Sequence, residues 1–429
     1  MTDVVSSSDA PARSGSGAAA RLRKRYAKER RFKLYGQLAI GVAVAFLMLL
    51  VGRIVEQGHT AFYSHRATSE IFLDPGRVDR AYPGGANYLQ LLAEQEAADL
   101  GVAGDPTAVR EVRDLFSSEL NFLAADAVEA DPSRIGQTIT LNAPLDDSAD
   151  LYLKGEIKRD TPADQRVLSD RQLDWLDAWR AEGLIEARFN SALFTRSDST
   201  QPEVAGVLGA LVGSALMLLV TALLALPIGV GAAVYLEEFS PRNRLTDLIE
   251  VNINNLAAVP SIVYGLLGVA LFINWMHLPR SSPLVGGLVL ALMSLPTIII
   301  ATRSALKAVP PSIREAALAL GASRTQAVFH HVLPLAAPGV MTGAIIALAH
   351  ALGETAPLLL IGMVSFVPGV PDAVTDPSSA LSVLVYIWEN ASERAFHERT
   401  AAAIMVLLTF MIAMNAVAII LRSRFERRW

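Results

Sequence analysis

Six long apolar segments constrain the fold of this chain more than any other feature of its sequence. A helix needs about 20 mostly apolar residues to cross a bilayer, because the hydrocarbon core is about 30 Å thick. Inside lipid, a single segment satisfies its own backbone N–H and C=O groups only as a helix. The sequence therefore predicts an all-α membrane protein with six transmembrane helices, near 35–55, 205–235, 252–276, 283–302, 339–363 and 400–421.

The composition agrees with this class and excludes some chemistry. Of the 429 residues, 52% are hydrophobic and 18% are charged, whereas soluble chains carry about 25% charged residues. The chain has no cysteine, which excludes disulfides, thiolate metal sites and cysteine nucleophiles. No metal site, catalytic set or phosphate-binding Gly-x4-Gly-Lys-Ser/Thr loop is predicted in the sequence.

Basic residues crowd both ends of the predicted bundle, at 21–33 and 422–428. Short basic flanks stay in the cytoplasm, so both termini are predicted to be cytoplasmic, as an even number of spans requires. The N-terminal segment 1–34 is expected to be basic and partly disordered, and 422–429 to form a basic cytoplasmic tail. The same alternation places 303–338 in the cytoplasm.

The segment 56–203 then lies outside the cytoplasm, between the first helix at 35–55 and a five-helix core at 204–421. It carries 27 acidic and 14 basic residues, whereas the rest of the chain is net basic. Strands are predicted at 137–141 and 151–157, and an amphipathic helix at 170–183. We expect an inserted extracytoplasmic α+β domain, whose role the sequence does not reveal.

A polar segment at 311–334 interrupts the apolar pattern of the core. Its first part predicts a short helix with Ile313 and Leu320 on one apolar face, and Gly321 permits a turn with positive φ. A second short helix follows, which Pro334 is expected to end. Two short helices joined at a glycine form a compact knob, suited to a cleft in another protein. The residues of interest are Glu315, Ala316, Ala317, Gly321, Leu333 and Pro334.

The fifth predicted span contains ionisable residues beside a helix breaker. His350 and Glu354 are four residues apart and share a helix face, so they can form a hydrogen bond or ion pair. Pro357 has no N–H, which leaves the Gly353 carbonyl without its helical donor. Buried charge and a broken helix predict a transport site or gate at His350, Gly353, Glu354, Thr355 and Pro357. The alternative is a kink in which His350 neutralises Glu354 for packing alone.

Three further charged residues lie near the ends of predicted spans. Arg303, at the end of the fourth span, is expected to extend its side chain to the membrane interface rather than to contact substrate. Glu237 and Glu238, at the end of the second, are interpreted as a solvated helix end, with a gating role as the alternative.

Two resemblances connect these features. The 311–334 segment resembles the EAA loop of ABC importer permeases, the element that docks into the cytoplasmic ATPase, and we call it the EAA segment. The stretches Gly353-Glu-Thr-Ala-Pro-Leu-Leu359 and Ala258-Val-Pro-Ser-Ile-Val-Tyr-Gly-Leu-Leu-Gly268 resemble the PstA family of phosphate importer permeases. This resemblance is strongest over 200–429, and 189–203 is similar to an extended N-terminal form of the family. Where the family often has an arginine before its Gly-Glu-Thr stretch, this chain has His350.

The resemblance implies a type I ABC importer permease that translocates phosphate, working with partner proteins. These would be a PstC-like second permease, a PstB-like ATPase dimer that binds ATP and magnesium, and a PstS-like binding protein, with membrane lipid but no nucleic acid. No cofactor would bind this chain itself. A permease for another oxyanion or small solute, a membrane sensor or scaffold, and an intramembrane enzyme are the alternatives.

Overall fold

The computed structural model describes residues 15–162 and 166–425. It divides into two compact units, 1–56 and 57–429, which are described separately. The described part of the first unit belongs to helix α1, Gly15–Gly58, which is long and apolar enough to span a membrane, as predicted. Of the segment 1–34, which was predicted to be partly disordered, residues 1–14 lie outside the described residues and residues 15–34 belong to α1.

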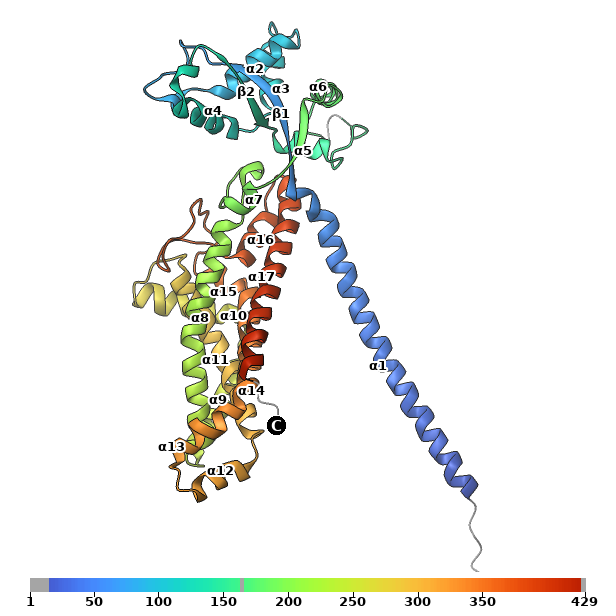
Figure 1. Cartoon of the computed structure of the whole chain (residues 1–429), viewed down its shortest axis with the longest axis vertical. Coiled ribbons are helices and arrows are strands. Elements are labelled where there is room, and N and C mark those ends of the chain that lie inside the picture. The colour runs from blue at the N-terminus through green and yellow to red at the C-terminus, as the bar shows by residue number, and fades with distance from the viewer. Residues whose placement is uncertain (1–14, 163–165, 426–429) are drawn as a thin grey trace, which may run out of the picture. The chain divides into compact units, whose positions relative to one another are not determined.

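Residues 63–189 of the second unit form an α+β region (Figure 1). Its antiparallel sheet has the order β2-β1-β3, with β1 at Tyr63–Phe72, β2 at Thr138–Pro144 and β3 at Ile185–Phe189. Its helices are α2 (Tyr88–Asp99), α3 (Pro106–Arg113), α4 (Glu119–Ala130), α5 (Asp147–Leu153) and α6 (Asp170–Ala181).

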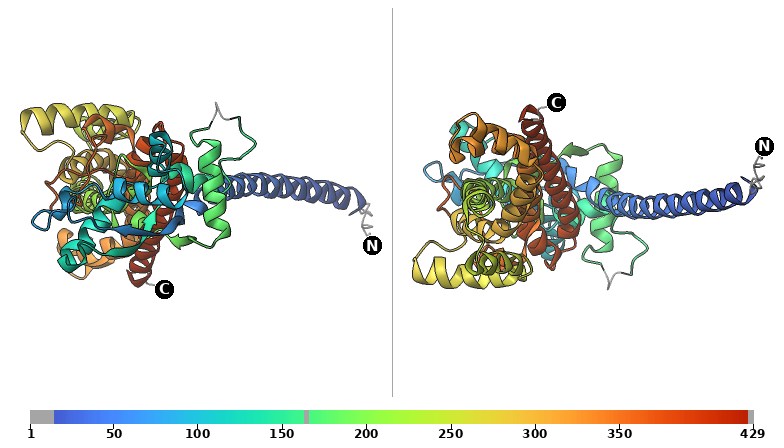
Figure 2. Two further views of the ribbon diagram at one scale, coloured as in Figure 1. Left: turned by 90° about the horizontal axis from the view of Figure 1, so that it is seen from above. Right: turned by 90° about the horizontal axis from the view of Figure 1, so that it is seen from below.

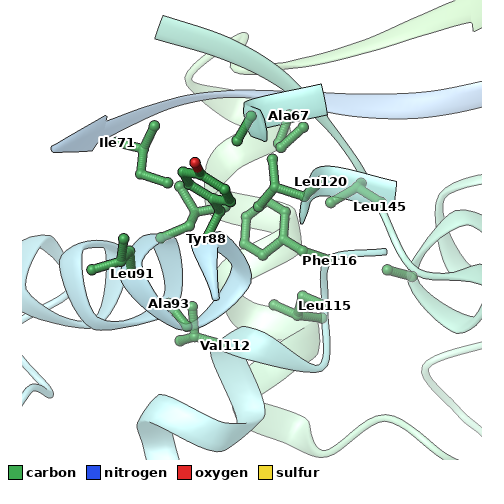
Figure 3. Close-up of a cluster of buried hydrophobic side chains, with 14 of the residues drawn as sticks. Ala67, Ile71, Tyr88, Leu91, Ala93, Val112, Leu115, Phe116, Leu120 and Leu145 are labelled. Carbon is green, nitrogen blue, oxygen red and sulfur yellow. The ribbon is translucent and has the colours of Figure 1, made fainter. Parts of the chain in front are cut away.

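The α+β region has a hydrophobic core of its own, shown in Figure 3. Ile71 of β1, Tyr88 of α2 and Leu120 of α4 are fully buried in it. The Tyr88 hydroxyl donates a hydrogen bond of 3.0 Å to the Pro83 carbonyl, so this ring is buried without an unsatisfied polar group.

The predicted helix at 170–183 is confirmed as α6, and the predicted strand at 137–141 as part of β2. The strand predicted at 151–157 is wrong, because that sequence contributes to helix α5. The Asp146 side chain accepts a hydrogen bond from the backbone N–H of Ser148 and so caps the helix. Leu151 and Leu153, whose spacing suggested a strand, are both buried from this short helix.

The long helices of the second unit pack side by side (Figure 1), and Figure 2 shows them end on. They are α8 (Leu208–Val234), α11 (Pro283–Lys307), α14 (Leu333–Gly353) and α17 (Ala395–Phe425). Helix α11 contacts both α8 and α14. Shorter helices complete the unit: α7 (Ala192–Thr195), α12 (Pro311–Ala319), α13 (Arg324–Ala327), α15 (Ala356–Leu360) and α16 (Leu381–Glu389).

Tighter and wider helical turns extend several of these elements. The 3₁₀ turns are η1 (His59–Phe62), η2 (Pro83–Gly85), η3 (Pro132–Arg134) and η5 (Pro202–Val204). The π-helical turns are η6 (Tyr235–Phe239), η7 (Val269–Trp275) and η8 (Val328–Val332).

The third predicted span, 252–276, is not one straight helix. Helix α9 (Arg244–Ala257) and the following α10 (Ser261–Gly268) with η7 are bent by 100°. Pro260 causes the break, since it lacks an N–H and disfavours helical angles at the residue before it. Among the described residues, five helices are long and apolar enough to span a membrane, or six if the bent pair counts as one span.

Buried charges connect the α+β region to the bundle. The Lys154 ammonium, which follows α5, lies 2.7 Å from Asp150 and 2.6 Å from Glu398 of α17. The three side chains are only 7%, 13% and 9% exposed, respectively. The buried Arg399 guanidinium donates to the Ala205 carbonyl at 2.9 Å. The α+β region is therefore fixed to the beginning of α17 by ionic contacts that water reaches poorly.

Candidate functional site

The EAA segment folds as two short helices joined at Gly321, as predicted. Gly321 has φ of +85°, and its N–H donates to the Leu318 carbonyl at 3.0 Å. The N–H of Ala322 donates to the Ala317 carbonyl at 3.1 Å. These two bonds form a Schellman motif, which satisfies carbonyls that the end of α12 would leave free. Ser323 then caps α13 with a reciprocal capping box.

Two details of the predicted knob are wrong. Pro334 does not end the second helix, because the chain passes from α13 through the π-helical turn η8 into α14. Proline is tolerated there since it occupies the first turn of α14. Leu320 does not join an apolar face; it is 90% exposed, since it caps α12 just before the chain turns at Gly321.

The six predicted residues of the EAA segment divide by exposure. Ala317 is buried and Leu333 is partly buried, whereas Glu315, Ala316, Gly321 and Pro334 are exposed. Next to them, Leu318, Leu320 and Phe329 present exposed apolar side chains. The segment therefore has a packed inner side, and its exposed side combines a carboxylate with apolar surface.

Charged residues at the ends of α8 and α11 are more buried than the sequence suggested. The expectation for Arg303 is corrected: its guanidinium contacts Glu237 at 3.3 Å and Glu250 of α9 at 2.5 Å. Glu238 is not a solvated helix end, since its side chain is 8% exposed and bonds Arg314 of the EAA segment at 2.5 Å. Sequence reasoning missed Arg314; the available indication was a basic residue directly before Glu315, with acidic residues at a nearby helix end.

The fifth predicted span is broken where Gly353 and Pro357 suggested. Helix α14 ends at Gly353, and Glu354 has an extended backbone with φ of −74° and ψ of 130°. Helix α15 begins at Ala356, with Pro357 in its first turn. The Ser382 hydroxyl of α16 donates to the Glu354 carbonyl at 3.0 Å, which gives a partner to a polar group released by the break.

The predicted His350–Glu354 pair is present. The His350 Nε2 atom lies 3.1 Å from a Glu354 carboxylate oxygen. The imidazole is 67% exposed, whereas the Glu354 side chain is 18% exposed. The imidazole therefore lies at the surface of this chain, while the carboxylate lies deeper beside the helix break.

Helix α10 packs directly onto this break, which the sequence did not predict. A Cβ atom at Gly265 of α10 would lie 2.7 Å from the Cα atom of Pro357. Glycine is therefore required for the close approach of α10 to α15. The two stretches that carry the PstA resemblance are thus in contact in the folded chain.

Comparison with protein families gives two matches. Residues 225–429 match the family described as "Binding-protein-dependent transport system inner membrane component". Residues 19–163 match a "Domain of unknown function" (DUF3333). With its apolar helices and this match, the chain is a multi-pass inner-membrane permease subunit of an ABC transporter, a class that works with ATPase and substrate-binding partners.

Individual relatives narrow this class. A probable ABC transporter permease protein, YqgI of Bacillus subtilis, is 33% identical over 46% of this chain and 70% of its own length. The phosphate transport system permease protein PstA 2 of Mycobacterium tuberculosis is 33% identical over 52% of this chain and 74% of its own. PstA of Haemophilus influenzae is 30% identical over 52% and 78%, respectively. The chain belongs to the PstA family of permease subunits.

Solved structures include a similar chain from an inward-facing MetNI methionine ABC transporter, which is 19% identical. The match covers 52% of this chain and 96% of that chain, with a TM-score of 0.43.

Proposed function

We propose that this chain is the permease subunit of an ATP-driven importer that carries inorganic phosphate across the bacterial inner membrane. The observation that supports the substrate is the set of relatives named as phosphate transport permeases, whose matches extend over at least 70% of their own length. The helix break with its His350–Glu354 pair is a polar site in the matched part of the chain.

We place both termini and the EAA segment in the cytoplasm, and the acidic α+β region outside. The basic flanks support this orientation. The EAA segment then docks into a PstB-like ATPase, where ATP and magnesium bind, with the exposed Leu320 and Phe329 entering an apolar cleft. A PstC-like chain completes the permease pair, and a PstS-like protein delivers phosphate from outside.

We assign the substrate pathway or gate to His350, Gly353, Glu354, Thr355 and Pro357. Glu354 alone would repel an anion, whereas a protonated His350 offers an N–H donor to a phosphate oxygen and balances the carboxylate. His350 thus takes the place of the arginine common in the family. The helix break allows α14 and α15 to move separately when the site opens and closes.

Reconstitution tests the proposal. The chain is purified with its second permease and ATPase, placed in liposomes, and supplied with the loaded binding protein, ATP and radiolabelled phosphate. ATP-dependent uptake that excess sulfate or molybdate does not reduce supports phosphate as the substrate. ATP-dependent uptake of another oxyanion in preference to phosphate would reject it and favour the alternative permease function.

A further inference from the structure

The guanidinium of Arg314 joins three elements at one end of the bundle. Its Nη2 and Nε atoms donate to the Glu238 carboxylate at 2.5 and 3.1 Å. Its Nη1 donates to the Val309 carbonyl at 2.8 Å, and Nη2 also donates to the Leu306 carbonyl at 2.9 Å. All three nitrogen atoms therefore point into the protein.

The groups that accept hydrogen bonds from Arg314 lie at the ends of two long helices, α8 and α11. Glu238 lies in η6, which extends α8, and its side chain is 8% exposed. Leu306 lies in the last turn of α11, where its carbonyl also accepts the Val309 N–H at 3.2 Å, and Val309 lies just beyond the helix end. A cation there also opposes the negative end of the helix dipole. Arg314 itself belongs to α12, so one side chain links α12 to both α8 and α11.

The neighbouring Glu237 makes a separate set of contacts. It faces Arg303 at 3.3 Å and Lys307 at 3.5 Å, both on α11. Arg303 also forms an ion pair with Glu250 of α9 at 2.5 Å. The Glu237 contacts therefore hold the long helices to one another, whereas Glu238 connects them to the EAA segment.

Arg314 and its neighbour Glu315 face different surroundings: Arg314 bonds within the chain, whereas Glu315 faces outward. Glu315 is exposed, as are Leu318 and Leu320, so these residues are available to a partner protein. Arg314 uses its donors within the chain. The second half of the EAA segment packs through the buried Val328 and Val332, so the Arg314 bonds act mainly on α12.

We propose that Arg314, with Glu238, is a positioning residue for transport: it transmits movement of α12 to α8 and α11. This inference rests on the proposed docking of the EAA segment to an ATPase. A planar guanidinium with bonds to two helix ends keeps α12 in a fixed orientation, whereas apolar contacts alone permit sliding. Loss of the Arg314 bonds uncouples ATP hydrolysis from transport without preventing assembly.

The test compares three variants of the full complex in liposomes. Arg314→Gln and Glu238→Gln each break the same contact, and Lys307→Gln removes an exposed cation from the same region as a control. We expect ATP hydrolysis within about twofold of the parent in all three. The phosphate taken up per ATP falls at least fivefold in the first two and is unchanged in Lys307→Gln. The double variant Arg314→Gln/Glu238→Gln is no worse than Arg314→Gln alone, since that change already removes every bond that Glu238 makes to the guanidinium.

A distance measurement keeps the inference separate from the identity of the substrate. The chain has no cysteine, so Ser312→Cys on α12 and Arg242→Cys, both exposed positions outside the proposed docking residues, accept spin labels at defined sites. In the assembled complex without nucleotide, we expect one narrow distance distribution in the parent and in Lys307→Gln. Arg314→Gln broadens it.

An unchanged ratio of uptake to hydrolysis together with an unchanged distance distribution in Arg314→Gln would overturn the inference. Loss of ATPase binding with an unchanged distance would also overturn it, since Arg314 would then be a docking contact. Absence of phosphate uptake by the parent complex would instead reject the proposed substrate, and the distance measurement would still decide the role of Arg314.

Discussion

Replacement of Lys154 by methionine tests whether buried charge holds the α+β region to the bundle. Methionine keeps the length of the side chain and removes the ammonium, so Glu398 loses the ion pair at 2.6 Å and Asp150 the one at 2.7 Å. Breaking a buried pair from one side costs about 3–5 kcal/mol. Asp150 keeps its bond to His65 at 2.8 Å, so we expect a loss near the lower limit, about 3 kcal/mol.

Denaturant unfolding of the detergent-solubilised protein measures this loss through tryptophan fluorescence. Trp179 packs on Phe116 in the α+β core, and Trp388 packs on Phe396 beside the junction, so both regions contain a reporter. Arg188→Gln is the matched control, since it breaks an exposed pair with Glu186 in the same region and should cost at most about 1 kcal/mol.

A further variant separates charge from packing. Glu398→Gln added to Lys154→Met removes the unpaired carboxylate on α17 and should recover part of the stability. A loss for Lys154→Met no larger than that for Arg188→Gln would refute the reasoning, because it would mean that water solvates the Lys154 cluster as it does a surface pair.

Three other predictions concern separate sites. Burial, together with Asp147, raises the pKa of Asp146 from its usual value of 3.8 to about 8. Between these two pH values the folded state therefore holds a proton on Asp146 that the unfolded state has lost. The stability of the folded state should therefore fall as the pH rises between these values. Asp146→Asn keeps the α5 cap and should flatten the pH profile of the unfolding midpoint. An equally steep profile in this variant would contradict the prediction. Gly321→Pro removes the bond to Leu318 and forbids φ of +85°, so the protein should still insert into membranes but lose ATP-dependent uptake at least tenfold; normal uptake would exclude docking through the EAA segment. Glu354→Gln should lower uptake severalfold with normal complex assembly on size exclusion, whereas unchanged uptake would favour the packing interpretation of the His350–Glu354 pair.

The sequence correctly predicted those features that depend on a few neighbouring residues. Lipid requires long helices, so the apolar segments of the sequence correspond to helices in the structure, with the third bent and the fifth broken after Gly353. Gly321 adopts the positive φ that glycine permits, and His350 of the last turn of α14 meets Glu354, which directly follows that turn as its C-cap residue. These outcomes depend on a few neighbouring residues.

The errors have tertiary causes. The alternation of Leu151 and Leu153 fits a strand, but capping by Asp146 and burial against neighbouring elements made a helix. Sequence spacing could not pair Arg314 with Glu238, which are 76 residues apart, or bring Gly265 onto Pro357. Contacts of this kind follow from how helices pack, and a single sequence does not encode them in its periodicity.

The pairing of β1 with β3 has a consequence for how this chain relates to shorter permeases. Tyr63 and Phe189 face each other across the two strands, and the Asn190 N–H donates to the Phe62 carbonyl at 2.8 Å. The chain therefore enters and leaves the α+β region at neighbouring points, a geometry in which a cassette of more than a hundred residues can be gained or excised without displacing its neighbours. Excision would also strand polar groups that now pair with this region, namely Glu398 with Lys154, Arg196 with Glu119 and Glu203 with Ser117.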